Sequence, residues 1–140
     1  MGLRFTVLAS GSTGNATVVS TDTANVLVDV GLSGKKIEEL MQLRGLAGSD
    51  LDAVFVTHEH SDHIKGLGAF ARKFGIPVYA NEKTWEAMIK HVGELPDHQR
   101  KVLDTDSVME IADLRIESYA ISHDAAEPVG YCFESDGAKL

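Results

Sequence analysis

A short apolar run followed at once by a cluster of histidines constrains this chain more than any other feature. Residues 53–67 read AVFVTHEHSDHIKGL. The opening AVFV is apolar and includes two β-branched valines, which predicts a strand buried on both faces. His58, His60, Asp62 and His63 follow before the apolar spacing changes to that of a helix. The pattern therefore predicts a strand-to-helix turn that carries several metal-binding side chains.

The residue types in this cluster indicate a divalent-metal site. Imidazole and carboxylate groups bind zinc, and they also suit manganese and iron. On an extended chain His58 and His60 lie on the same side, and the turn brings Asp62 and His63 back toward them. A helix cap explains Asp62 alone, and a surface or core position explains one histidine alone, but neither explains all four. A purely structural zinc site is less consistent with these residue types, because such sites are usually rich in cysteine and this cluster has none.

The remaining pattern predicts strands and helices that alternate and then give way to a run of strands. Strands are expected at residues 3–9, 15–20, 25–31, 51–57 and 76–80, and after Pro96 at residues 101–104, 107–111, 114–121 and 129–135. Helices are expected at residues 33–45, 62–75 and 81–93. Ser33 and Asn81 are the expected N-caps, and Gly45 and Gly75 the expected ends of the first two helices. This order predicts an α/β fold in which helices cover a mixed sheet.

Composition excludes some classes of protein and leaves others open. No apolar run approaches the roughly 20 residues that span a bilayer, so no membrane association is expected. Cys132 is the only cysteine, which agrees with a reducing cytoplasm. The formal net charge of −8 argues against a nucleic-acid-binding face unless bound cations dominate the local field. The sequence does not identify a protein partner.

Several motifs together resemble one known family. THEHSDH matches the His-x-His-x-Asp-His signature of the metallo-β-lactamase superfamily. NVLVDVGLS resembles the early strand of that superfamily that ends in an aspartate, here Asp29, and YAISHDAAEPVGYCFES resembles the segment that carries its next metal-binding histidine, here His123. Combined with ASGSTGN and LVDVGLSGKKIE, these motifs look most similar to the WalJ/YycJ-type branch, a group of DNA-processing hydrolases.

The resemblance implies an αβ/βα sandwich of two similar halves, with two divalent metal ions at the edge where the halves meet. One metal would be bound by three histidines, His58, His60 and His123. Asp62 and His63 would bind the second metal, and Asp62 would also guide the proton of the attacking water. Asp29 would orient a ligand histidine, a role that fits general metal-site logic; the simpler view is a strand-end aspartate that starts a turn.

The implied activity is hydrolysis by a metal-activated water, with DNA as substrate and a phosphodiester as the bond that is cleaved. The alternative is a hydrolase of small esters, thioesters or lactones on the same dinuclear site. Residues 11–15, GSTGN, lack the lysine and helix of a P-loop. We expect them to form a tight hairpin that borders the site. His91 and His98 are expected to be exposed to solvent.

The sequence also departs from the family pattern after His123. The superfamily has a further bridging aspartate and a last histidine ligand, and neither Asp124 nor Asp136 stands in a suitable context. CFESDGAKL predicts a strand, an Asp-Gly turn and the start of a partner strand. We therefore expect residues 1–140 to be the N-terminal part of a single metallo-β-lactamase-like domain, with the missing ligands beyond Leu140. Such a part is expected to be inactive by itself.

Overall fold

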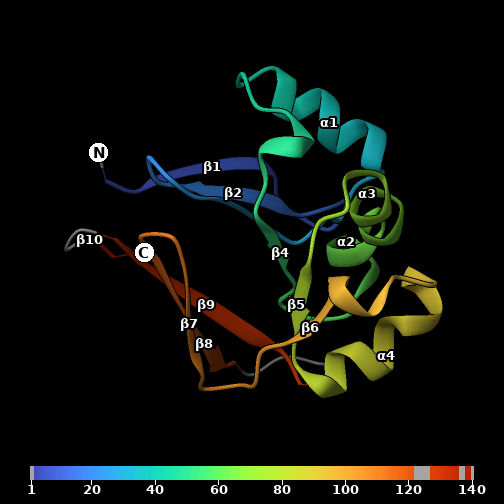
Figure 1. The fold of residues 1–140 in the computed structure, drawn as a ribbon. Coiled ribbons are helices and arrows are strands. Elements are labelled where there is room, and N and C mark those ends of the chain that lie inside the picture. Colours follow the sequence, from blue (N-terminus) through green and yellow to red (C-terminus); the bar gives the residue numbers. More distant parts are fainter. Residues whose placement is uncertain (1, 122–126, 136–137, 140) are drawn as a thin grey trace.

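Two β-sheets face each other, and helices cover the outer face of the larger sheet (Figure 1). The computed structural model describes residues 2–121, 127–135 and 138–139. Among these residues no helix is long and apolar enough to cross a membrane. The described chain thus has three layers: helices, the larger sheet and the smaller sheet.

The larger sheet, sheet A, has six strands in sequence order. They are β1 Arg4–Ala9, β2 Ala16–Ser20, β3 Asn25–Val28, β4 Ala53–Phe55, β5 Val78–Ala80 and β6 Arg100–Val102. The first three strands pair antiparallel, and β3 to β6 run parallel. The parallel strands are joined through helices, as parallel strands must be joined by long crossover connections.

The parallel strands are apolar on both faces because each face meets a core. Leu27 and Val54 point to the helices, whereas Val26, Ala53 and Phe55 point to the smaller sheet. All five side chains are buried. This alternation follows from the two-residue repeat of a strand, and it explains why residues 53–56 form a continuous apolar run.

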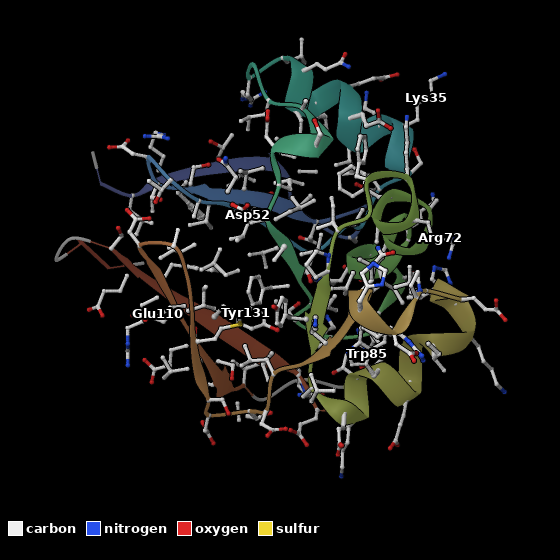
Figure 2. All side chains as sticks on the ribbon, in the orientation of Figure 1. Lys35, Asp52, Arg72, Trp85, Glu110 and Tyr131 are labelled. Carbon is white, nitrogen blue, oxygen red and sulfur yellow. The ribbon has the colours of Figure 1, made fainter. Side chains whose placement is uncertain are left out.

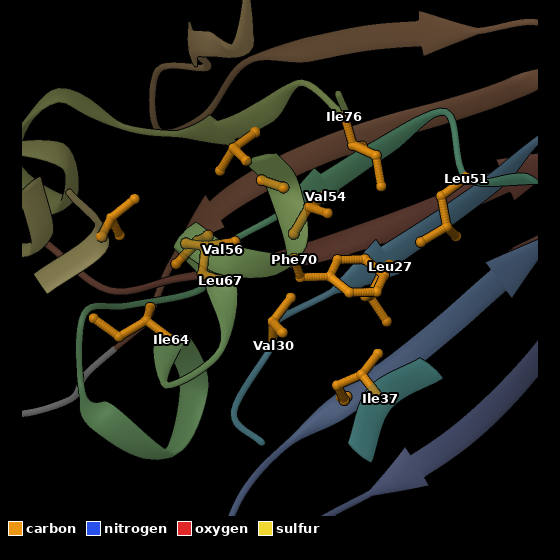
Figure 3. Close-up of a cluster of buried hydrophobic side chains, with 14 of the residues drawn as sticks. Leu27, Val30, Ile37, Leu51, Val54, Val56, Ile64, Leu67, Phe70 and Ile76 are labelled. Atoms are coloured by element: carbon orange, nitrogen blue, oxygen red, sulfur yellow. The ribbon is translucent and has the colours of Figure 1, made fainter. Parts of the chain in front are cut away.

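Four helices pack on the outer face of sheet A. They are α1 Gly34–Gln42, α2 Ser61–Ile64, α3 Leu67–Phe74 and α4 Glu82–Val92. Ile37 of α1 and Leu67 and Phe70 of α3 meet Leu27 and Val54 of the sheet in one core (Figure 3). Ser33 and Asn81 accept capping hydrogen bonds from Lys36 and Thr84, which confirms both predicted N-caps.

The predicted helix over residues 62–75 is wrong in one respect, because it is two helices with a break at Gly66. The Gly66 N–H donates to the Val30 carbonyl at 3.0 Å. A Cβ at Gly66 would lie 2.1 Å from the Leu32 carbonyl oxygen. The chain therefore leaves helical geometry to pack against the loop after β3, a tertiary contact that helical spacing does not reveal. Gly75 ends α3 in the left-handed conformation, as predicted.

The smaller sheet, sheet B, has four antiparallel strands in the order β10-β9-β8-β7. They are β7 Val108–Ile111, β8 Leu114–Ala120, β9 Val129–Ser135 and β10 Ala138–Lys139. The pairing of β9 with β10 confirms the predicted partner strand; the Asp-Gly turn itself lies outside the described residues. Tyr131, labelled on β9 in Figure 2, packs against Phe55 and donates to the Val56 carbonyl at 2.7 Å.

A carboxylate joins the turns at one end of the two sheets. Asp113, in the β7–β8 turn, accepts hydrogen bonds from Thr21 at 2.5 Å and Thr23 at 2.6 Å. Its other oxygen lies 3.4 Å from the Ser135 hydroxyl. The hydrogen bonds from Thr21 and Thr23 hold the pKa of Asp113 below its usual value. A lowered pKa in the folded state means that the ionised carboxylate contributes to stability.

Asp113→Asn is therefore expected to destabilise the protein in a pH-dependent way. The carboxylate's contribution is present above the unfolded-state pKa of about 3.9 and is lost as the pH falls through the lower folded-state pKa. The urea midpoint of the variant should lie below that of the wild type at pH 7, and the gap should narrow below pH of about 4. Asp104→Asn, at another exposed aspartate, is the control. If the urea midpoints of wild type and Asp113→Asn differ by the same amount across this pH range, the ionised Asp113 carboxylate is not the source of the difference.

Candidate metal centre

Asp29 and the histidine cluster that begins at His58 lie where two neighbouring parallel strands end. Asp29 directly follows β3, and Thr57 and His58 come two and three residues after β4. Asp29 stays in register with β4, because its N–H donates to the Phe55 carbonyl at 2.8 Å. The carboxyl ends of parallel strands are the usual place for ligand sites in α/β sheets. The fold therefore brings two separate sequence motifs to one edge.

Asp29 has a conformation that few residues adopt. Its φ angle is +64°, in the left-handed region where aspartate and asparagine are enriched among non-glycine residues. The residue is buried, with 4% of its surface exposed. Left-handed backbone turns the chain sharply at the end of β3 and directs the carboxylate to the residues that follow β4. Backbone strain of this kind clusters at functional sites.

The imidazole rings of the cluster converge. The ring centroids of His58 and His63 are 3.8 Å apart, and those of His58 and His60 are 4.9 Å apart. One ligand atom from each of His58, Asp62 and His63 lies within 4.8 Å of the others. His60 thus lies beside this group of three, and the predicted division of the ligands between two metals remains a prediction. His123 lies outside the described residues.

Asp62 lies in the first turn of α2 but does not cap that helix. The N-cap position of α2 belongs to His60, whose side chain makes no capping hydrogen bond. The Asp62 carboxylate instead faces His63, with Oδ2 at 3.5 Å from Nε2. The simpler view of Asp62 as a helix cap therefore does not describe the structure.

Buried Asp29 forms a close pair with partly buried His63. Asp29 Oδ2 lies 2.5 Å from His63 Nδ1. Burial raises the pKa of Asp29 above its ordinary value, against the opposing effect of its bonds to His63 and Thr57. Burial would lower the pKa of His63, but the bond to Asp29 and the charges of Asp29 and Asp62 outweigh it, so that this pKa is raised. In the neutral ring, a hydrogen on Nδ1 leaves Nε2 as the ligand atom.

Thr57 links Asp29 to both histidines. Its N–H donates to Asp29 Oδ1 at 2.8 Å, and its hydroxyl lies 2.8 Å from Asp29 Oδ2. The same hydroxyl is 2.9 Å from His58 Nδ1 and 3.2 Å from His63 Nδ1. Sequence reasoning missed Thr57, although its place between the apolar run and the first histidine is a usable signal.

Asn15 is the second residue that sequence reasoning missed. Its side-chain nitrogen lies 3.2 Å from Asp62 Oδ2 and 3.3 Å from His63 Nε2. Its side chain also exchanges hydrogen bonds with the Gly11 backbone. The GSTGN loop therefore joins β1 to β2 and borders the cluster, as predicted. An asparagine at the end of a glycine-rich turn is the sequence feature that could have pointed to Asn15.

A glycine allows three segments to meet at the cluster. Gly31, two residues after Asp29, donates to the Asn15 carbonyl at 2.9 Å. A Cβ at Gly31 would lie 1.9 Å from the Asp62 carbonyl oxygen and 2.4 Å from the Asn15 nitrogen. No other residue type fits this approach without movement of the backbone.

A hollow of about 380 Å³ adjoins the cluster. Its lining includes His58, His63 and Asp29 together with the apolar side chains of Val7, Val28, Tyr119, Ile121 and Val129. His91 and His98, as predicted, are exposed and lie apart from this site in the sequence. The donor set fits a divalent cation: imidazole nitrogen and carboxylate oxygen are zinc ligands.

Comparison with known proteins identifies the family. The model of the metallo-beta-lactamase superfamily matches residues 9–140. The chain belongs to the metallo-β-lactamase superfamily. Two curated relatives are exodeoxyribonuclease YycJ of Bacillus anthracis, 52% identical over 140 residues, and exodeoxyribonuclease WalJ of Streptococcus pneumoniae, 45% identical over 138 residues. These alignments cover 100% and 97% of this chain and 53% and 51% of the relatives. The predicted resemblance to the WalJ/YycJ-type branch is confirmed.

A solved structure of the superfamily confirms the fold class. A metallo-β-lactamase of Cronobacter sakazakii superposes with a TM-score of 0.78 at 16% identity. The match covers 92% of this chain and 57% of that chain. The chain spans about half the length of the curated relatives YycJ and WalJ that it matches.

Proposed function

We propose that this chain supplies much of the metal centre of a phosphodiesterase that degrades DNA from an end. The convergence of His58, Asp62 and His63 within 4.8 Å, at the end of two parallel strands, carries the proposal. The exodeoxyribonuclease names of relatives at 52% and 45% identity support DNA as the substrate. The single cysteine is consistent with a cytoplasmic location of the protein.

We propose two divalent ions, with zinc first and manganese or iron as alternatives. One would be held by His58, His60 and His123, and the other by Asp62 and His63. Residues in the other half of the relatives' length would complete the ligands, and residues 1–140 would form the first part of one domain.

When bound, divalent ions activate water as a nucleophile and neutralise charge on a phosphate diester. The residues of this chain would hold the ions, handle the proton of the water and orient the ligand histidines. Asp62 would hold a cation and receive the proton of the attacking water. Asp29, through its 2.5 Å contact with His63 Nδ1, would keep Nε2 of that ring directed at the cation. No serine, cysteine or lysine nucleophile is required.

The net charge of −8 is compatible with this substrate if cations occupy the centre. Two divalent ions add four positive charges at one point of the surface, and bound cations are often the largest local charges in a site. DNA would then be attracted to the centre rather than to a broad basic face. The proposal predicts that duplex binding is lost on metal removal.

The test uses a chimera in which this chain replaces the 140-residue region of B. anthracis YycJ to which it aligns. With manganese, end-labelled duplex DNA should release nucleotides, and EDTA should stop the release. The 140-residue chain alone should release none. Asp62→Asn in the chimera should lower the rate by about 100-fold or more. Cleavage of thioesters or lactones with intact DNA would instead support the small-substrate alternative and reject the nuclease.

A further inference from the structure

We propose that the Thr57 hydroxyl fixes the tautomer of His58, so that a single carboxylate, Asp29, orients two metal-ligand histidines. The inference rests on the proposed metal-dependent function, because it concerns the same histidines. Asp29 reaches His63 directly and reaches His58 only through Thr57. Thr57 is therefore a positioning residue and not a ligand.

A count of hydrogens gives the direction of each bond. Ionised Asp29 can only accept, and a threonine hydroxyl has one hydrogen and two lone pairs. The hydroxyl hydrogen goes to Asp29 Oδ2 at 2.8 Å. The oxygen of Thr57 must then accept from His58 Nδ1 at 2.9 Å. His58 consequently carries its hydrogen on Nδ1, and the lone pair on Nε2 is the one that can bind a metal.

The backbone holds Thr57 in this arrangement. Its N–H donates to Asp29 Oδ1 at 2.8 Å, so both oxygens of the carboxylate are engaged by one residue. Its carbonyl accepts from the Val129 N–H at 2.9 Å, which attaches it to β9 of sheet B. With both backbone groups bonded and Asp29 buried, the hydroxyl cannot change partners without the loss of a bond to a buried carboxylate.

The test compares Thr57→Val, which keeps the shape and removes the hydroxyl, with Thr57→Ser, which keeps the hydroxyl. Long-range ¹H–¹⁵N NMR on the metal-free protein, labelled at histidine nitrogens, reads the tautomer of His58. The wild type and Thr57→Ser should carry the hydrogen on Nδ1, whereas Thr57→Val should show the Nε2–H form or a mixture. Zinc affinity, measured by competition with a chromogenic chelator, should fall by about 10- to 100-fold in Thr57→Val. In Thr57→Ser it should stay within about threefold of wild type. Circular dichroism checks that all three proteins are folded.

The outcomes separate this inference from the proposed function. An Nε2–H form of His58 in the wild type, or equal zinc affinity in wild type and Thr57→Val, would overturn the role of Thr57. An equal loss in Thr57→Ser and Thr57→Val would also overturn it, because the hydroxyl would not be responsible. If the wild type binds no zinc but its NMR spectrum shows the Nδ1–H form, the hydrogen-bond assignment holds and the proposed metal-dependent function fails.

Discussion

His58→Ala is expected to weaken zinc binding by more than about 100-fold, beyond the 10- to 100-fold typical of residues that only orient a ligand. His58 is buried, contacts the His60 and His63 rings, and belongs to the group of three convergent ligand residues. Its removal takes away one of the three convergent donor groups. Competition with a chromogenic chelator measures the affinity, and elemental analysis after gel filtration measures the metal retained.

His91→Ala is the matched control for this prediction. His91 is an exposed histidine of α4, so its removal should leave zinc affinity within about threefold of wild type. If both variants lose zinc equally, binding is non-specific. If His58→Ala retains wild-type affinity, the metal centre does not lie at this cluster.

Gly31→Ala is expected to lower the free energy of unfolding by about 3 kcal/mol or more, because it forces a methyl group against backbone atoms that cannot rotate away. The new Cβ would lie 1.9 Å from the Asp62 carbonyl oxygen and 2.4 Å from the Asn15 nitrogen. Relief of this overlap must separate the β1–β2 loop from the start of α2. Urea unfolding gives the stability change, and the same variant should also lose zinc affinity.

Gly34→Ala provides the comparison three residues further along. There the added Cβ meets Phe70 atoms at 3.6 Å or more, which is ordinary contact, and the residue opens α1. Alanine is a better helix former than glycine, so the free energy of unfolding should stay the same or rise. Equal destabilisation by the two variants would show that steric overlap at Gly31 is not the cause.

The local part of the candidate metal centre was predictable from sequence. The apolar run before Thr57 identified a buried strand, and the spacing from His58 to His63 predicted that those side chains converge. Both patterns involve neighbours in the chain, where strand and turn geometry limit the possible arrangements. The caps at Ser33 and Asn81 were predictable for the same reason.

The contacts between distant segments were not predictable in this way. Asn15 meets Asp62 across 47 positions, and Thr57 meets Asp29 across 28 positions. Neither residue has a type or spacing that identifies its partner. The break at Gly66 likewise depends on the carbonyl groups of Val30 and Leu32. Periodicity describes which face of an element is buried and carries no information about which backbone group approaches it.

Because the cluster is assembled from separate segments, the concentration of free metal ions is expected to affect the stability of the folded chain. The β1–β2 loop, the end of β3 and the start of α2 meet only in the folded chain, where they position the candidate ligands. A bound ion would therefore favour the folded chain, because the unfolded chain cannot hold those ligands equally well. At a free-ion concentration 100 times the dissociation constant, such linkage contributes about 2.7 kcal/mol to the folded state. Metal depletion would then make the protein less resistant to proteases and heat.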